Sequence, residues 1–425
     1  MIHIFYEIVS IMENDYAGCR DKQSATTSTE YSEEIIKLNS SSRISREQFV
    51  EFVQSYLRNY EDHHISFKDM NIHPVKNVHK GFKVRRYEEV LYITEISSEN
   101  TLKVGMKIHS LGGKTIKELK QKHIHLLNEN HPERENWTPI LTKYDYGVIE
   151  DQQGKVYEIE FQNYKRSNYE ARYTLETYDN KTLILTITDF MDSDAIARLI
   201  NENQELLVEK ENWIIDVRVN YGGADVSFYH LLPYIMPEDG IDLLDTDEFM
   251  LFNCTSANAD KALKEIQNDL ENTKDPETIA FLRVFQREWE KNKGKGFVQF
   301  DFADIIPDTF VKGTKLPKKV IVLSDTMCGS SGDSFVEICK KSNKVTVLGR
   351  PTKGLNDYAN LVTQEWEEGF QFSYPTSRLS RIDKGRGMSK VGIKPDIYIP
   401  WTPKHLEVDV DLEFALSFIN RFYVS

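Results

Sequence analysis

The pattern of apolar and polar positions divides the chain into three stretches. Residues 1–60 carry apolar positions at helical spacing, and Ser45 is a candidate N-cap for an amphipathic helix at 47–60. Short apolar runs typical of buried strands occur from about residue 166, at 171–175, 183–187, 213–217, 320–323 and 345–348. Amphipathic stretches typical of helices separate some of these runs, at 193–209, 258–270, 276–292 and 333–341. The alternation predicts an α/β core with helices packed on a mainly parallel sheet.

The middle stretch, residues 78–165, contains two strand-forming segments. V-L-Y-I-T-E-I at 90–96 is followed by L-K-V-G-M-K-I-H-S-L-G-G-K-T-I at 102–116. These segments resemble the core of a PDZ domain, in which the second piece usually reads L-x-x-G-D-x-I-x-x-I-x-G-x-x-V. Met106 replaces the usual acidic residue. The resemblance implies a PDZ-like β-rich domain with an open sheet edge for an extended peptide. A β-rich spacer without a ligand is the alternative.

A turn of small residues between a predicted strand and a predicted helix holds the candidate nucleophile. C-G-S-S-G at 328–332 follows the apolar run 320–323 and precedes the helix at 333–341. A serine in this position stands close to backbone N–H groups, which can bind the oxyanion that its attack on a carbonyl creates. An ordinary pair of N-capping serines gives the same local pattern.

Three further motifs accompany this turn. They are D-V-R-V-N-Y-G-G at 216–223, G-R-P-T-K-G at 349–354 and G-I-K-P-D at 392–396. Together with S-S-G-D at 330–333, they resemble the D-x-R-x-N-x-G-G, S-x-G-[ED], G-x-x-T-x-G and G-I-x-P-D signatures of the S41 peptidase family, which includes the C-terminal processing peptidases and the tricorn core protease. The resemblance covers roughly residues 55–400. It implies an N-terminal helical region at 1–77, the PDZ-like domain at 78–165 and a ClpP/crotonase-like α/β S41 core at 166–425.

The resemblance assigns the nucleophile and the oxyanion hole. Ser330 is the nucleophile, because the family's serine precedes the acidic residue by three positions and Asp333 follows Ser330 by three. Ser331 is the rival hydroxyl in the same turn, and its backbone N–H is one expected oxyanion donor. The Gly222-Gly223 turn would supply the second donor, since the absence of side chains lets the backbone approach a substrate.

The general base has two candidates. Processing peptidases use a Ser/Lys dyad, but Leu355 stands where their lysine would be, and Lys353 lies two positions earlier. The tricorn-like branch uses Ser/His, and its D-G-H-T element resembles D-H-H-I at 62–65, which puts His64 in the role of base. Imidazole titrates close to neutral pH and is suited to accept the proton.

The third member of a triad is less clearly marked. The tricorn-like pattern has an acid just before the G-I-x-P-D turn, where this chain has Ser389. Asp383 is the nearest carboxylate upstream, and Asp357 is another contender. Either one would orient the imidazole and stabilise its cation.

Composition narrows the classes of function. The net charge of −14 argues against nucleic acid or an acidic membrane surface as the main partner. No run of eighteen apolar residues occurs, so no membrane span is expected. The four cysteines, at 19, 254, 328 and 339, form no C-x-x-C pair, which argues against a disulfide framework or a zinc site. The N-terminus resembles a signal peptide poorly, so we expect a cytoplasmic enzyme.

Together these features predict a serine endopeptidase that hydrolyses peptide bonds through an acyl-enzyme. It would act on peptides or unfolded proteins and need no metal or cofactor. The alternative is a peptide-binding protein with an S41 fold that has lost catalysis. Leu355 and Ser389, which depart from the family pattern, favour that alternative.

Overall fold

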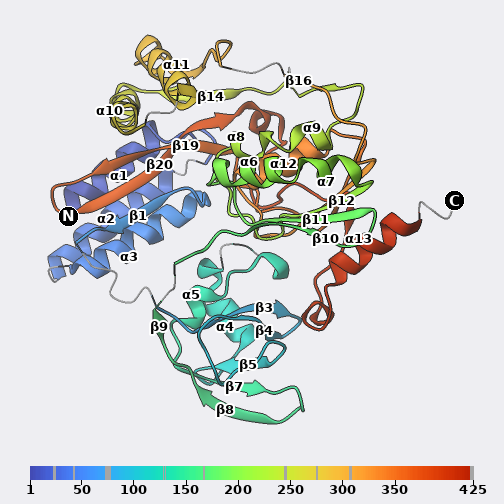
Figure 1. The fold of residues 1–425 in the computed structure, drawn as a ribbon. Helices are drawn as coiled ribbons and strands as arrows, with labels where there is room; N and C mark the ends of the chain where they lie inside the picture. Colours follow the sequence, from blue (N-terminus) through green and yellow to red (C-terminus); the bar gives the residue numbers. More distant parts are fainter. Residues whose placement is uncertain are drawn as a thin grey trace. The chain divides into compact units, whose positions relative to one another are not determined.

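The chain divides into two units, each assembled from three separate stretches (Figure 1). The first unit contains Met1–His73, Asp242–Val311 and Gly354–Ser389. The second contains Pro74–Ile241, Lys312–Lys353 and Lys390–Ser425. The structure is a computed structural model, and it describes residues 1–22, 25–41, 44–71, 78–127, 129, 131–165, 168–243, 247–273, 276–305 and 309–421.

Residues 1–60, expected to be helical, form three helices that open the first unit. They are α1 (Ile2–Asn14), α2 (Ala25–Ser41) and α3 (Arg46–Leu57), and the 3-10 turn η1 (Arg58–Tyr60) follows them. The start of α3 is fixed by a capping box, in which the Ser45 hydroxyl accepts from the Gln48 N–H (3.1 Å) and the Gln48 side chain accepts from the Ser45 N–H (2.9 Å). The N-cap predicted at Ser45 is confirmed.

An antiparallel sheet packs in the same hydrophobic core as these helices. Its strands are β1 (Ser66–Asp69), β14 (Met250–Cys254), β15 (Gly296–Gln299), β19 (Tyr358–Glu365) and β20 (Phe370–Leu379). The order is β1-β20-β14-β15, and β19 also pairs with β20. The helices expected at 258–270 and 276–292 form a hairpin, α10 (Ser256–Asn272) and α11 (Pro276–Asn292). Phe49, Phe252 and Phe372 are fully buried between these layers.

The second unit contains the predicted α/β core. Its sheet has the order β10-β11-β12-β17-β18-β21 and is parallel from β11 onward. The strands are β10 (Tyr173–Thr177), β11 (Thr182–Ile187), β12 (Asn212–Asp216), β17 (Lys319–Ser324), β18 (Val345–Gly349) and β21 (Ile397–Tyr398). The helices are α6 (Ser193–Glu202), α7 (Gln204–Glu209), α8 (Val226–Tyr229), α9 (Leu232–Ile235), α12 (Ser331–Cys339) and α13 (Val410–Arg421). The mainly parallel sheet with helices is therefore confirmed.

The register of this sheet determines which loops meet. β12 and β17 are parallel neighbours, and Asp216 pairs with Leu323 at their carboxyl ends. Loops that leave adjacent parallel strands emerge at the same edge of a sheet. The loop carrying Gly222 and Gly223 and the turn carrying Ser330 therefore begin side by side.

The segments that resemble a PDZ core fold as a separate sheet within the second unit. Its order is β3-β4-β5-β7-β8, with β6 paired to β5. The strands are β3 (Phe82–Tyr87), β4 (Val90–Ile96), β5 (Lys107–Leu111), β6 (Lys114–Thr115), β7 (Tyr146–Glu150) and β8 (Val156–Glu160). Leu91, Ile108 and Trp137 are buried in its own core.

Short elements complete the described chain. In the β-rich part they are α4 (Ile116–Lys122), η2 (Ile124–Leu126), η3 (Pro132–Arg134), α5 (Thr138–Leu141), β2 (Val78–His79) and β9 (Tyr164–Lys165). Elsewhere they are β13 (Ile241–Asp242), β16 (Phe310–Val311), η4 (Ser380–Lys384) and η5 (Pro403–Leu406). None of the described helices combines the length and the apolar character that crossing a bilayer requires.

Candidate active site

Ser330 occupies a strained position between β17 and α12. Its φ of 58° and ψ of −124° are values that residues with a side chain rarely adopt. The fully buried Asp333 holds this conformation, because its Oδ2 accepts from the Ser330 N–H at 2.8 Å. The Asp333 N–H donates to the Ser330 carbonyl oxygen at 2.7 Å. The acidic residue of the S-x-G-[ED] motif thus fastens the turn at 328–333, hereafter the Ser330 turn.

The Gly-Gly loop, residues 220–225, packs directly on the Ser330 turn. Gly222 has a φ of +77°, and a Cβ atom there would lie 2.6 Å from the Ser330 Cβ. A Cβ atom on Gly223 would lie 2.2 Å from the Phe190 backbone. Only glycine fits both positions, because each combines an unusual backbone conformation with a very close neighbour.

Asn220 joins the two loops, a role that the sequence did not reveal. Its Oδ1 accepts from the Gly222 N–H at 3.0 Å, and its side-chain amide donates to the Ile187 carbonyl oxygen at 3.0 Å. The Gly329 N–H donates to the Asn220 carbonyl oxygen at 2.9 Å. The asparagine of the D-x-R-x-N-x-G-G motif therefore fixes the Gly-Gly loop against the Ser330 turn.

Two backbone N–H groups beside Ser330 have no acceptor among the described residues. Within the described chain, no residue accepts a hydrogen bond from the N–H of Gly223 or from the N–H of Ser331. Gly222 differs, because its N–H is already bonded to Asn220. A pair of unoccupied N–H groups next to a serine is the arrangement that stabilises the oxyanion of acyl transfer.

Lys353 lies on the segment that runs beside the Ser330 turn. Its backbone N–H donates to the Cys328 carbonyl oxygen at 2.5 Å, and its Nζ is 4.0 Å from Glu129 Oε1. Arg134 pairs with Glu129 and donates to the carbonyl oxygens of Thr352 and Lys353, each at 2.7 Å. Burial lowers the pKa of Lys353. The contacts of Glu129 and Arg134 with this segment were not predictable, because both residues lie more than two hundred positions from Lys353.

The G-x-x-T-x-G and G-I-x-P-D motifs meet in the same unit and have structural roles. The Thr352 hydroxyl accepts from the Ile393 N–H at 2.8 Å. A Cβ atom on Gly392 would lie 1.9 Å from the Thr352 carbonyl oxygen. Asp396 accepts from the Val347 N–H at 2.8 Å. These contacts tie the chain that follows β18 to the end of the sheet.

His64 belongs to the first unit and follows η1. The Asp62 Oδ1 accepts from the His64 backbone N–H at 2.9 Å and lies 3.8 Å from the His64 Nδ1. The Tyr16 hydroxyl donates to Asp62 Oδ2 at 2.7 Å. Asp62 is thus the carboxylate that the structure places against this imidazole, a contact that the D-H-H-I segment does not reveal by itself.

The two carboxylates considered for the third triad position have other partners in the first unit. Asp383 forms an ion pair with Arg378 at 2.8 Å, and this arginine lowers the pKa of Asp383. Asp357 is buried and accepts from the N–H groups of Met388 (2.9 Å) and Ser389 (2.7 Å).

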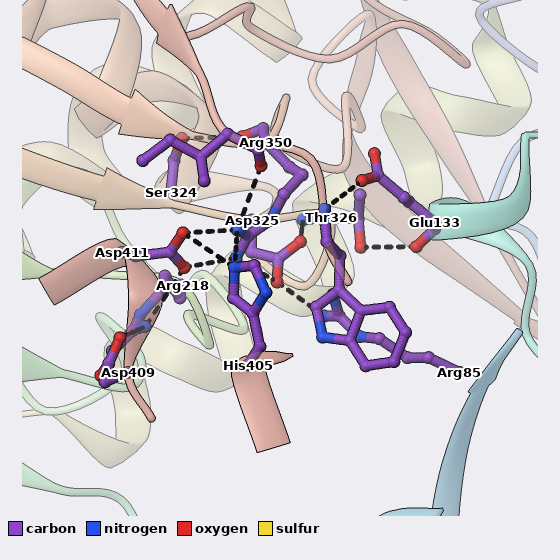
Figure 2. A network of polar contacts seen from close by, with 12 residues as sticks. Arg85, Glu133, Arg218, Ser324, Asp325, Thr326, Arg350, His405, Asp409 and Asp411 are labelled. Carbon is purple, nitrogen blue, oxygen red and sulfur yellow. Dashed lines mark hydrogen bonds and ion pairs between the residues drawn. The ribbon is translucent and has the colours of Figure 1, made fainter. Parts of the chain in front are cut away.

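A network of buried charges surrounds the strand ends that lead to the Ser330 turn (Figure 2). Arg350, which is 2% exposed, donates to both oxygens of Asp411 at 2.7 Å and to Asp325 at 3.0 Å. Arg85 on β3 also pairs with Asp325, at 2.6 Å. Burial by itself would raise the pKa of Asp325, but the charges of Arg85 and Arg350 hold it well below the usual range.

The D-x-R motif extends this network. Arg218 pairs with Asp216 at 2.7 Å. It also pairs with Asp409 at 2.7 Å and lies 3.3 Å from Asp411 (Figure 2). The internal pairing of Arg218 with Asp216 that the sequence suggested is confirmed. The start of α13 is thereby bound to the carboxyl ends of β12 and β18, and the charges of the motif have partners within the protein.

The chain belongs to peptidase family S41, because the family model matches residues 181–399. Solved structures with the same fold include mature CPAF, which has 14% sequence identity and a TM-score of 0.66, with 97% of this chain and 95% of that chain covered. Mature CPAF complexed with lactacystin has 13% identity and a TM-score of 0.67, with 100% and 98% covered. No curated protein matches the sequence. The family and the α/β core predicted from the four motifs are confirmed.

Proposed function

We propose that this member of a peptidase family is a serine endopeptidase with Ser330 as its nucleophile. The single observation that carries the proposal is the position of Ser330, on a strained turn between two backbone N–H groups that lack an acceptor among the described residues. Strain at a serine persists only where the surrounding structure enforces it, and such positions cluster at active sites. An ordinary capping serine needs neither the strain nor the unoccupied donors.

The reaction proceeds in two acyl-transfer steps. The Ser330 Oγ forms a bond to the substrate carbonyl carbon while the general base takes the hydroxyl proton. The carbonyl oxygen becomes an oxyanion that accepts from the N–H groups of Gly223 and Ser331. The base then gives its proton to the leaving amine as the peptide bond breaks, and water hydrolyses the ester by the same route.

We propose His64 as the general base, oriented by Asp62 or Asp383. The alternative is a dyad of Ser330 and Lys353. The lowered pKa of Lys353 favours its neutral, proton-accepting form, whereas the neighbouring Glu129 favours the charged form. An imidazole needs no such balance to accept a proton near neutral pH, which is why we prefer His64.

The substrates in this proposal are peptides or unfolded proteins. The β-rich part of the second unit is proposed to be a PDZ-like module that receives an extended peptide at a sheet edge, as its sequence resemblance implies. The catalytically inactive alternative, a peptide-binding S41 fold, derives its support from Leu355 and Ser389, which replace the expected lysine and acid.

A fluorophosphonate probe tests the proposed function, because such probes label only an activated serine. We expect stoichiometric labelling of the native protein, loss of labelling in Ser330→Ala and retained labelling in Ser331→Ala. The second variant is the matched control, since it removes the neighbouring hydroxyl but leaves the backbone donor. Absence of labelling in the native protein, or labelling that survives in Ser330→Ala, would remove Ser330 from the mechanism.

A further inference from the structure

A carboxylate without a cationic partner stands beside the two unoccupied donors. Asp225 follows Gly223 by two residues, and its Oδ1 accepts from the Ser331 hydroxyl at 2.5 Å. Ser331 directly follows Ser330, so the Cα atoms of the two residues are about 3.8 Å apart. Asp225 therefore contacts the residue next to the proposed nucleophile. No lysine, arginine or histidine in the described part of the chain pairs with Asp225.

The hydrogen-bond partners of Asp225 in the described chain are neutral hydroxyls, so no cation there balances its charge. It precedes α8, yet its side chain makes no capping hydrogen bond to that helix. The residue is exposed to solvent, and its carboxylate accepts hydrogen bonds from the hydroxyls of Ser331 and Ser334 on α12. Burial among the surrounding residues raises the pKa of Asp225. A partly enclosed carboxylate held by neutral hydroxyls is stabilised further when a positive group approaches it.

Exposed apolar side chains flank this carboxylate. Val226 is 51% exposed and directly follows Asp225, while Tyr221 and Tyr229 are also exposed. Burial raises the pKa of Tyr229, and the charge of Asp225 raises it further, which indicates that the phenol and the carboxylate are close. Met191, 64% exposed, adjoins Gly223, since a Cβ atom there would lie 2.6 Å from the Met191 backbone nitrogen. An apolar surface with one placed polar group is typical of a binding site.

We propose that Asp225 is a specificity-determining residue that binds the side chain of a substrate lysine or arginine next to the scissile bond. This inference rests on the proposed function, with Ser330 as nucleophile. Lysine and arginine carry an apolar stem and a cationic tip, so the stem lies on the exposed apolar side chains while the tip pairs with the carboxylate. The net charge of −14 also attracts cationic peptides over a longer range.

Cleavage of matched fluorogenic peptides tests this specificity. The peptides differ at one position, which holds arginine, lysine, glutamine or norleucine. In one series this position directly precedes the scissile bond, and in the other it directly follows the bond. The native enzyme is expected to cleave the basic peptides with a kcat/KM about 10- to 100-fold above the neutral ones, the range for one desolvated charge pair. In Asp225→Asn this ratio should fall to about one, while the rate on the neutral peptide stays within several-fold.

Two control variants separate specificity from structure. Ser331→Ala removes one hydroxyl that binds Asp225 but keeps the carboxylate charge, so the preference for basic peptides should persist, although weaker than in the native enzyme. Asp239→Asn removes one negative charge from an exposed residue of the same unit and should leave the ratio unchanged. A native enzyme without preference for basic peptides, or an Asp225→Asn variant that keeps the preference, would overturn the inference.

A binding measurement distinguishes failure of this inference from failure of the proposed function. Fluorescence anisotropy of labelled arginine and norleucine peptides is measured with Ser330→Ala and with the double variant that also carries Asp225→Asn. The arginine peptide should bind Ser330→Ala about tenfold more tightly, and the difference should vanish in the double variant. Preferential binding without any turnover or probe labelling would refute the peptidase proposal and leave the cation site standing. Equal binding of both peptides would refute the cation site alone.

Discussion

Gly222 packs directly against Ser330, since a Cβ atom at residue 222 would lie 2.6 Å from the Ser330 Cβ. It would also lie 2.8 Å from the Gly329 carbonyl oxygen. Gly222→Ala must therefore displace either the Ser330 turn or the Gly-Gly loop that carries the Gly223 donor. We expect kcat to fall about 10²- to 10³-fold, the usual effect of losing one oxyanion donor. Steady-state kinetics and the rate of fluorophosphonate labelling both measure this loss.

Gly154→Ala is the matched control for this substitution. Gly154 also has a positive φ, +81°, but a Cβ atom there would meet nothing within 4 Å. The variant should lose about 1–2 kcal/mol of unfolding free energy from backbone strain and keep its activity. Equal activities of the two alanine variants would contradict the role given to the contact between Gly222 and Ser330.

The identity of the general base is tested by two alanine variants. His64→Ala should lower kcat/KM about 10²- to 10⁴-fold, because the Ser330 hydroxyl would lose its proton acceptor. Lys353→Ala should stay within about tenfold of the native enzyme, and His63→Ala serves as the control for a neighbouring histidine. A large loss in Lys353→Ala together with an active His64→Ala would assign the base to the Ser/Lys dyad.

The charge network makes a prediction about stability. Asp411 accepts two hydrogen bonds from the buried Arg350, so Asp411→Asn removes a negative charge that balances this guanidinium. We expect the free energy of unfolding to fall by about 3 kcal/mol, as when one member of a buried ion pair is removed. Urea unfolding followed by circular dichroism measures it. Glu407→Gln, an exposed substitution nearby, should change the value by less than about 0.5 kcal/mol, and a similar effect of both variants would contradict the assigned role.

The same network predicts how stability depends on pH. Burial would raise the pKa of Asp411, but hydrogen bonds from His405 and Arg350 hold it well below the usual range. A carboxylate with a depressed folded-state pKa stabilises the fold fully above its unfolded pKa, about 3.9, and loses that contribution as the pH falls through the folded value. This contribution should therefore be constant from pH 7 to about pH 5 and decline below about pH 4. The gap in urea midpoint between the native protein and Asp411→Asn should shrink only in that acidic range, and a gap that closes above pH 5 would contradict the prediction.

The α/β core was predictable because its strands are continuous buried runs. The segments 183–187, 213–217 and 320–323 coincide with β11, β12 and β17 to within one residue at each end. The sheet of the first unit was not predicted. β14 and β20 pair although their sequences lie more than a hundred residues apart, and no local pattern encodes a partner at that separation.

Only those residues of the candidate site that belong to sequence motifs could be predicted. Ser330, Gly222 and Asp333 were marked by motifs that resemble those of the S41 family, and the structure brings them together. The contact of Asp225 with the Ser331 hydroxyl was not predictable, because a polar contact between two loops has no periodicity. The contact between Asp62 and His64 was not predictable for a different reason, because it depends on the turn that the backbone makes after η1.

Trapping the acyl-enzyme tests the central claim most directly. The protein is mixed with an activated ester substrate, quenched in acid within the steady state and digested for peptide mass spectrometry. We predict one acyl group on the peptide that contains residues 328–333, located on Ser330 and absent from Ser330→Ala. An acyl group on a different residue, or turnover with no acyl adduct at all, would contradict the account.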